Sequence, residues 1–224
     1  MWGQKTRLVT QGFYVGSEVD LPLTPITHVS LRWRPTTRGD NVERMAATRI
    51  TWQDVQTMPE DGNRYEAIDG DMYVTPAPKT SHQAVSMNLT IGLFRLLVEP
   101  GHGRLFYAPV GVEFVETEEG VQPDLVFVRT GRLKIVREDT IQGAPDLVIE
   151  ILSPTTARRD RGIKLQLYQR HGVAEYWIVD IEAKQVEVWA FATGATHPER
   201  HTTILPVRLG DRPIGSIDLS KVFD

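Results

Sequence analysis

Residues 143–156 read GAPDLVIEILSPTT, and they are the most informative segment of this 224-residue chain. Residues 147–152 are almost all large and apolar, which predicts a central β-strand that is buried on both faces. Pro154 ends this strand, and a capped helix is expected to follow as far as about residue 171. One charged residue, Glu150, interrupts the apolar run, so its side chain needs a partner or a function.

The acidic residue Glu150 has a candidate partner in Asp124. A buried carboxylate loses several kcal/mol of hydration unless a cation or a hydrogen-bond donor compensates it. Asp124 opens the preceding apolar strand, residues 125–128. If the two strands are neighbours, both carboxylates lie at one edge of the sheet and can share a divalent ion, for which hard oxygen ligands favour magnesium or manganese. The alternative is that Glu150 pairs with an arginine or a lysine for structural reasons.

The helix after Pro154 carries the basic residues Arg158, Arg159, Arg161 and Lys164. Cations in the first turns of a helix oppose its dipole, so this placement favours a surface that faces phosphate groups. Lys164 stands one turn before Leu167, on the side expected to face the sheet, where its ammonium group could approach the two carboxylates. Asp160 and Lys164 are four residues apart, which also fits an exposed ion pair of little consequence.

The rest of the chain predicts a mixed sheet with helices. Asp69-Gly70 is a hairpin signal between two short strands, and apolar residues recur at helical spacing from His82 to Glu99. Further strands are expected at residues 105–115, 125–128, 147–152, 176–180 and 186–189, with an outer strand near 204–209. This order predicts an α/β (α+β) fold, in which helices flank a mixed central β-sheet in one domain.

Residues 1–44 read differently from this domain. They hold scattered proline and glycine with no sustained helical or strand periodicity. We therefore expect residues 1–44 to be an extension outside the fold, either a flexible segment or sequence upstream of the true start codon. The domain itself is expected at residues 45–224.

Composition excludes several classes of protein. The 25 Lys+Arg and 29 Asp+Glu give a net charge of −4, which argues against binding of nucleic acid by bulk charge but leaves room for a local basic groove. Cysteine is absent, which excludes disulfides, zinc–thiolate sites and thiol catalysis. No apolar run approaches the roughly 18 residues of a membrane helix, and no signal peptide is recognisable, so a cytoplasmic protein without a membrane partner is expected.

The central segment resembles the signature of the Uma-two family of restriction-endonuclease-like domains, which belongs to the PD-(D/E)XK nuclease superfamily. The other matching pieces are YEAIDG at 65–70, His82, PDL at 123–125, Arg159-Asp160, Lys164, Tyr168 and GVAEYWIVD at 172–180. The resemblance covers about residues 48–215. It implies a mixed central sheet flanked by helices and metal-dependent hydrolysis of phosphodiester bonds.

The resemblance also implies site residues. Asp124 corresponds to the first acid of the superfamily, Glu150 to the second, and Glu66 to an acid near the N-terminus of the domain. The lysine usually found two residues after the second acid is replaced by Leu152. Because the superfamily tolerates migration of this lysine to a neighbouring helix, Lys164 is the expected substitute.

The resulting hypothesis is an endonuclease acting on nucleic acid, with DNA as the expected substrate. Asp124, Glu150 and the main-chain carbonyl of Ile151 would hold Mg²⁺ or Mn²⁺, with Glu66 as an outer or second-metal ligand. Lys164 would orient the attacking water or neutralise charge on the phosphate. The residues expected to grip flanking phosphates are Arg158, Arg159 and Arg161. A homodimer would allow two sites to cut both strands.

Two alternatives stay open at this point. Leu152 in place of lysine favours a nuclease-like module that binds nucleic acid or a partner protein without cutting. A hydrolase of another phosphoester would fit the same basic helix. His82 lies beside Ser81 at a helix start, so a capping or packing role is expected for it rather than that of a catalytic base.

Overall fold

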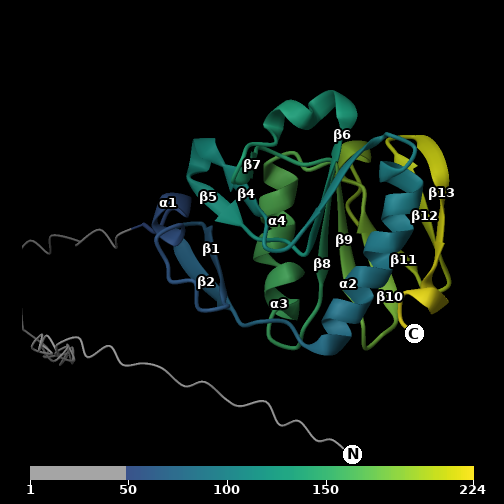
Figure 1. Cartoon of the computed structure of the whole chain (residues 1–224), viewed down its shortest axis with the longest axis horizontal. Coiled ribbons are helices and arrows are strands. Elements are labelled where there is room, and N and C mark those ends of the chain that lie inside the picture. Colours follow the sequence, from purple (N-terminus) through teal and green to yellow (C-terminus); the bar gives the residue numbers. More distant parts are fainter. Residues whose placement is uncertain (1–48) are drawn as a thin grey trace, which may run out of the picture. The chain divides into compact units, whose positions relative to one another are not determined.

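A computed structural model of the chain describes residues 49–224 (Figure 1). The expected extension, residues 1–44, and the expected domain start at residue 45 lie outside the described residues. Residues 49–224 form mixed β-sheets flanked by helices, which confirms the predicted fold class. Within this range no helix combines the length and the apolar character needed to cross a membrane.

The central sheet has six strands in the order β11-β10-β9-β8-β6-β3 (Figure 1). Strand β8 (Leu147–Ile151) is parallel to β9 (Glu175–Asp180) and antiparallel to β6 (Leu125–Arg129), so the sheet is mixed. All five residues of β8 are buried, as the apolar run predicts. The outer strands are β3 (Gly103–Tyr107), β10 (Gln185–Trp189) and β11 (Glu199–His201).

One face of the central sheet is covered by α2 (Thr80–Leu93), which continues as a π-helical segment, Phe94–Val98. Its buried residues Val85 and Leu89 belong to the same apolar core as Ile149 of β8. A hairpin of β12 (Ile204–Leu209) and β13 (Arg212–Asp218) adds to this core beside α2. Burial of apolar surface on this face therefore fixes the side from which α2 approaches the sheet.

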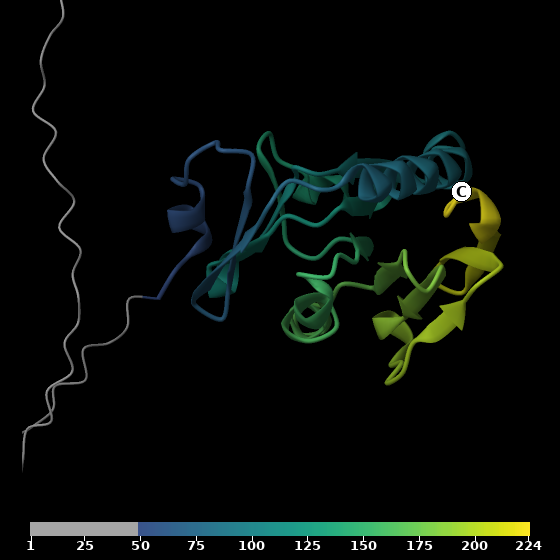
Figure 2. The same ribbon diagram turned by 90° about the horizontal axis from the view of Figure 1, so that it is seen from below.

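The opposite face carries α3 (Ala157–Asp160), α4 (Ile163–Arg170) and a second sheet of order β2-β1-β5-β4-β7. Figure 2 shows α2 and α4 on opposite sides of the central sheet. Leu167 and Tyr168 of α4 pack with Val148 of β8 in a second apolar core. The remaining elements are α1 (Trp52–Val55), β1 (Arg64–Ile68), β2 (Asp71–Thr75), β4 (Gly111–Phe114), β5 (Glu119–Val121) and β7 (Thr140–Gln142), with 3₁₀ segments at Val115–Thr117, Thr130–Ile135, Phe191–Thr193 and Leu219–Lys221.

The β1–β2 hairpin forms as predicted. Asp69 and Gly70 both have positive φ, 54° and 86°, which is the conformation that the two central residues of this turn require. The predicted single strand 105–115 is wrong, because the chain turns at Ala108-Pro109 and places β3 and β4 in different sheets. Pro109 lacks the backbone N–H that a continuous ladder would need.

The predicted single helix after Pro154 is also divided. Arg161 and Gly162 separate α3 from α4, and the backbone of Gly162 lies at φ −115° and ψ −99°, outside the helical region. The break begins a new helix at Ile163, so Lys164 stands in the first turn of α4. Lys164 therefore approaches the sheet from a helix end rather than from the middle of a long helix.

Candidate active site

The two acids singled out in the sequence lie on neighbouring strands. Strands β6 and β8 are antiparallel with Leu125 opposite Ile149, so the next pair along the ladder is Asp124 opposite Glu150. Directly opposite residues of an antiparallel pair point to the same face of a sheet. Each of the two acids is only 4% exposed. The strand order therefore brings Asp124 and Glu150 together, while their chemical role stays a prediction.

Asp124 is held by three donors from distant parts of the chain. Its Oδ1 accepts a hydrogen bond of 2.7 Å from Arg64 Nη1, and its Oδ2 accepts one of 2.7 Å from the Ile151 amide. Oδ2 also lies 3.1 Å from His82 Nε2. Burial alone would raise the pKa of Asp124, but the hydrogen bond with His82 and the charge of Arg64 lower it to about 2. Asp124 is therefore ionised at neutral pH.

Lys164 joins the other acids in one buried cluster. Its Nζ lies 2.7 Å from both Glu66 Oε1 and Glu150 Oε1, and 4.0 Å from Asp160 Oδ1. Burial alone would lower the pKa of Lys164, but the three carboxyl groups outweigh it and raise the pKa above its ordinary value. Lys164 and Asp160 are both buried, so the reading of this pair as exposed is wrong.

Glu150 has the opposite electrostatic character to Asp124. Its Oε1 accepts hydrogen bonds of 2.7 Å from Lys164 Nζ and from the Tyr168 hydroxyl. Burial nevertheless raises the pKa of Glu150 to about 8, and Asp160 and Asp124 add to the rise. Two adjacent carboxyl groups whose pKa values are driven apart are characteristic of functional sites.

The donor set fits a hard divalent ion in its chemistry. Glu66 Oε2 and Asp160 Oδ1 are buried without a hydrogen-bond partner among the described residues, so the cluster contains unsatisfied carboxylate oxygens. Within residues 49–224, however, no three His, Asp or Glu side chains are grouped at a spacing that would hold an ion. The positive charges of Lys164 and Arg64 lie against the acids instead. An ion at this site would compete with these cations.

The position at which the superfamily usually has lysine is part of the apolar core in this chain. Leu152 is 8% exposed and packs in the apolar cluster that includes Leu167 and Tyr168. Lys164, from α4, reaches Glu150 in its place. The substitution suggested by the sequence is thus geometrically available.

The three arginines do not share one surface. Arg159 turns inward, where it hydrogen-bonds the Thr75 hydroxyl and its Nη2 lies 3.7 Å from Glu66 Oε2. Its guanidinium also lies 5.5 Å above the ring of Tyr73. Arg161 pairs with Asp180 and Glu187 at 2.8 and 3.2 Å. Arg158 is exposed, and it forms no ion pair or side-chain hydrogen bond with the described part of the chain. A phosphate-gripping role for these side chains stays a prediction, and Arg158 is the most available of them.

Sequence reasoning missed two groups at Asp124. His82 was expected to cap or pack, yet its imidazole contacts a buried carboxylate. Its signal was present, because His82 shares the buried stripe of α2 with Val85 and Leu89. Arg64 begins β1, directly before the segment that resembles the family, and no periodicity marks it as a partner of Asp124.

Asp124 should make the free energy of unfolding depend on pH in the acidic range. Its folded pKa of about 2 lies below the ordinary 3.8, so its stabilising effect is present above pH 4 and is lost as the pH falls toward 2. We expect the unfolding free energy of the unsubstituted protein to fall by about 2 kcal/mol more between pH 5 and pH 2 than that of Asp124→Asn. Urea unfolding at each pH measures this, and parallel pH profiles would contradict the assignment.

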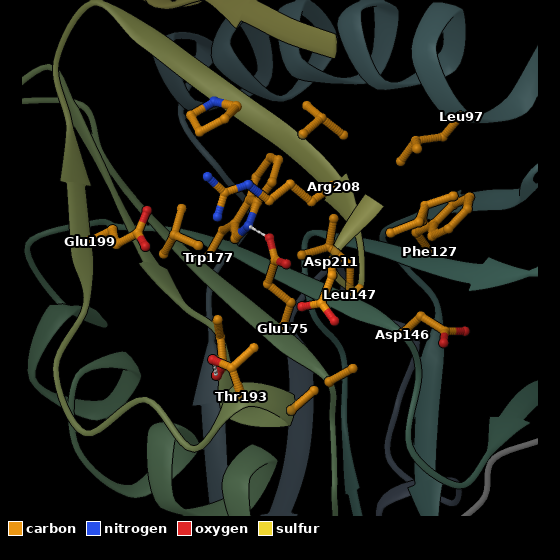
Figure 3. Close-up of a pocket in the computed structure, with 18 of the residues that line it drawn as sticks. Leu97, Phe127, Asp146, Leu147, Glu175, Trp177, Thr193, Glu199, Arg208 and Asp211 are labelled. Atoms are coloured by element: carbon orange, nitrogen blue, oxygen red, sulfur yellow. Dashed lines mark hydrogen bonds between the residues drawn. The ribbon is translucent and has the colours of Figure 1, made fainter. Parts of the chain in front are cut away.

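A cavity of about 200 Å³ lies on the side of the central sheet opposite the acid cluster (Figure 3). None of the predicted site residues line it. Its charged lining includes Asp146, Glu175 and Arg208. Asp146 accepts hydrogen bonds from the Arg129 amide and from Arg132 Nη1, at 2.9 Å each. Asp146 thus serves the entrance of β8, as its position before the strand suggests.

Comparisons with known proteins agree with the fold and indicate a family. Residues 52–210 match the family model Uma2, described as "Putative restriction endonuclease". The "Uncharacterized protein slr1290" of Synechocystis sp. is 24% identical over 139 residues, which are 62% of this chain and 68% of that protein. A crystal structure of "a putative nuclease belonging to DUF820" from Anabaena variabilis has a TM-score of 0.63 at 20% identity and covers 78% of this chain and 97% of its own, which shows the shared fold. Since the family match extends over most of the sequence, the chain belongs to the Uma2 family of restriction-endonuclease-like proteins.

Proposed function

We propose that this protein is a divalent-metal-dependent endonuclease that hydrolyses phosphodiester bonds of nucleic acid, with DNA as its substrate. The observation that carries the proposal is the buried pair Asp124 and Glu150, opposite each other on β6 and β8, with the Lys164 ammonium 2.7 Å from Glu150. Membership of the Uma2 family and the nuclease-like fold support it.

The metal would be held by oxygen atoms from the strands around the acid cluster. Asp124, Glu150 and the carbonyl of Ile151 would supply them, and Glu66 would add a carboxylate from β1. Bound Mg²⁺ or Mn²⁺ supplies Lewis acidity and lowers the pKa of a bound water. Because burial raises the pKa of Glu150 to about 8, metal binding at neutral pH would release a proton from this carboxyl group.

Lys164 supplies fixed positive charge in this scheme. The surrounding carboxyl groups keep its pKa above the ordinary value, so its ammonium stays charged and can donate to a phosphate oxygen or orient a water. Tyr168 remains a hydroxyl, since its pKa is raised well above 10, and it holds Glu150 Oε1 in place. Arg158, which is exposed on α3, would contact a flanking phosphate. Arg159 and Arg161 would have to exchange their present partners, Thr75 and Asp180, to do the same.

Incubation of the purified protein with supercoiled plasmid, and separately with single-stranded DNA, tests the proposal. We expect nicked circles to appear with Mg²⁺ or Mn²⁺ and none with EDTA, because the ion activates the attacking water. A homodimer with two sites would also yield linear DNA, which gel electrophoresis separates from nicked circles. Intact plasmid and intact single-stranded DNA under both metal conditions would contradict the proposal.

A module that binds without cutting is the second candidate. It is favoured by the engagement of Asp124 with Arg64 and of Glu150 with Lys164, which leaves no ready-made ion site among residues 49–224. Calorimetric titration with Mn²⁺ separates the two. The endonuclease hypothesis predicts saturable Mn²⁺ binding that is lost in Asp124→Asn. The hypothesis of a module that only binds predicts that no Mn²⁺ binds.

A further inference from the structure

A cavity of about 1210 Å³ opens beside Asp124. It lies between α1 and the loop that follows it, the outer side of α2, and the turn between β3 and β4. Asp124, Arg64 and His82 all line it, so the cavity reaches the side chains that surround the first acid. Its size exceeds the roughly 300–1,000 Å³ of pockets for single small molecules, which leaves room for part of a polymer.

The charge of this cavity does not suit a phosphate backbone. Its charged lining residues are Glu60, Arg64 and Asp124, together with the imidazole of His82. Arg64 is the sole lysine or arginine in the lining, and its guanidinium is bound to Asp124 at 2.7 Å. No cation in the lining is therefore free to neutralise a phosphate. The lining therefore suits the uncharged bases of a nucleic acid rather than its phosphates.

The rim instead presents large exposed side chains suited to stacking. Tyr107 is 69% exposed and Met87 is 60% exposed, and both line the cavity. Tyr107 is the last residue of β3 and pairs with Leu125, the neighbour of Asp124. The next residue, Ala108, donates its amide to the Asp124 carbonyl at 3.0 Å. The backbone of Tyr107 is thus fixed next to the first acid of the proposed active site.

The remaining polar groups of the lining can meet the edges of bases. They include the side-chain amides of Gln56, Asn63, Gln83 and Gln122. Each amide offers both a donor and an acceptor, which is the mixed pattern that nucleobase edges carry. A paired base in a duplex has its edge hydrogen-bonded and both faces stacked, so it cannot use these groups and an aromatic platform together.

We propose that this cavity receives an unpaired nucleobase that stacks on Tyr107, so that the substrate of the adjacent site is single-stranded or carries an extruded base. This inference rests on the proposed function, since it assumes that the ligand of the chain is nucleic acid. It adds the strandedness of the substrate and assigns a binding residue that lies outside the acid cluster.

Fluorescence anisotropy in EDTA tests the inference without requiring cleavage. The probes are a labelled twelve-nucleotide oligothymidine and the same strand annealed to its complement. We expect the single strand to bind at least tenfold more tightly than the duplex, and Tyr107→Ala to weaken single-strand binding by about tenfold, which is the scale of one lost stacking contact. The matched control is Phe94→Ala, an aromatic that is 49% exposed but lies outside the cavity lining, and it should bind like the unsubstituted protein.

Equal affinity of Tyr107→Ala and the unsubstituted protein, or equal affinity for single strand and duplex, would overturn the inference. Equal losses in Tyr107→Ala and Phe94→Ala would overturn it as well, because the effect would then not belong to this cavity. The proposed endonuclease activity fails separately, in the plasmid assay with metal. If the protein binds the single strand through Tyr107 but never cleaves DNA, this inference stands and the proposed endonuclease activity is wrong.

Discussion

Replacing Lys164 with methionine is expected to lower the free energy of unfolding by about 3–5 kcal/mol. Methionine is one atom shorter than lysine and keeps its unbranched apolar stem, but it removes the one ammonium group that touches both Glu66 and Glu150. Those carboxyl groups, with Asp160 at 4.0 Å from the ammonium, would then share a buried space without that cation. Removing one partner of a buried ion pair is strongly destabilising because the other charge stays behind. Urea unfolding at neutral pH measures the effect.

The matched control for this prediction is Lys221→Met, because Lys221 is exposed and in the last 3₁₀ segment. It should change stability by less than about 0.5 kcal/mol. The double variant Lys164→Met with Glu66→Gln should recover part of the loss, since one carboxyl group fewer is then left without the ammonium. A Lys164→Met protein as stable as the unsubstituted one would show that the cluster is not held together by this ammonium.

Glu150→Gln is expected to reduce metal-dependent nicking of plasmid DNA by about a thousandfold or more. The amide keeps the shape of the side chain, and its oxygen can still accept from Lys164 and Tyr168, so the fold should be retained. What is lost is the carboxylate that the proposed ion needs. Single-turnover cleavage rates measured with Mn²⁺, together with circular dichroism of the variant, separate a chemical effect from unfolding.

Glu175→Gln provides the comparison for this loss of activity. Glu175 lies on the neighbouring strand β9 and lines the smaller cavity on the other side of the sheet (Figure 3). The same change of acid to amide there should leave the cleavage rate within about twofold of the unsubstituted protein. If Glu150→Gln cleaved at an unchanged rate, the role given to Glu150 would be wrong even though the fold and family stand.

The sequence was sufficient to predict the elements that local patterning specifies. The apolar run 147–152, the Asp69-Gly70 turn and the periodicity of α2 each carry a short-range signal, and each element is present. Glu150 was also recognisable from the sequence as an unusual acidic residue inside a buried strand. That Asp124 lies opposite Glu150 was conditional on β6 and β8 being neighbours, although β7 lies between them along the chain.

The partners of the acids could not be read from the sequence, because they arrive from distant elements. Arg64 and His82 are 60 and 42 residues away from Asp124, and only packing brings them to it. The break between α3 and α4, in contrast, falls at Gly162, and glycine is a poor helix former, so the sequence did carry a signal for it. Charge on one short segment predicted a phosphate-facing surface, yet Arg159 and Arg161 each found acidic partners that the linear pattern did not reveal.

The ladder between β6 and β8 makes insertions more harmful than most substitutions. Side chains alternate along a strand, so one extra residue inside Leu125–Arg129 or Leu147–Ile151 would slip the pairing and rotate an acid toward the α2 side. There the carboxylate would enter a layer of leucine and valine, far from the ammonium of Lys164. The pairing therefore constrains the chain length across these ten residues, and it constrains part of the connection between them as well, because β7 within that connection pairs with β4.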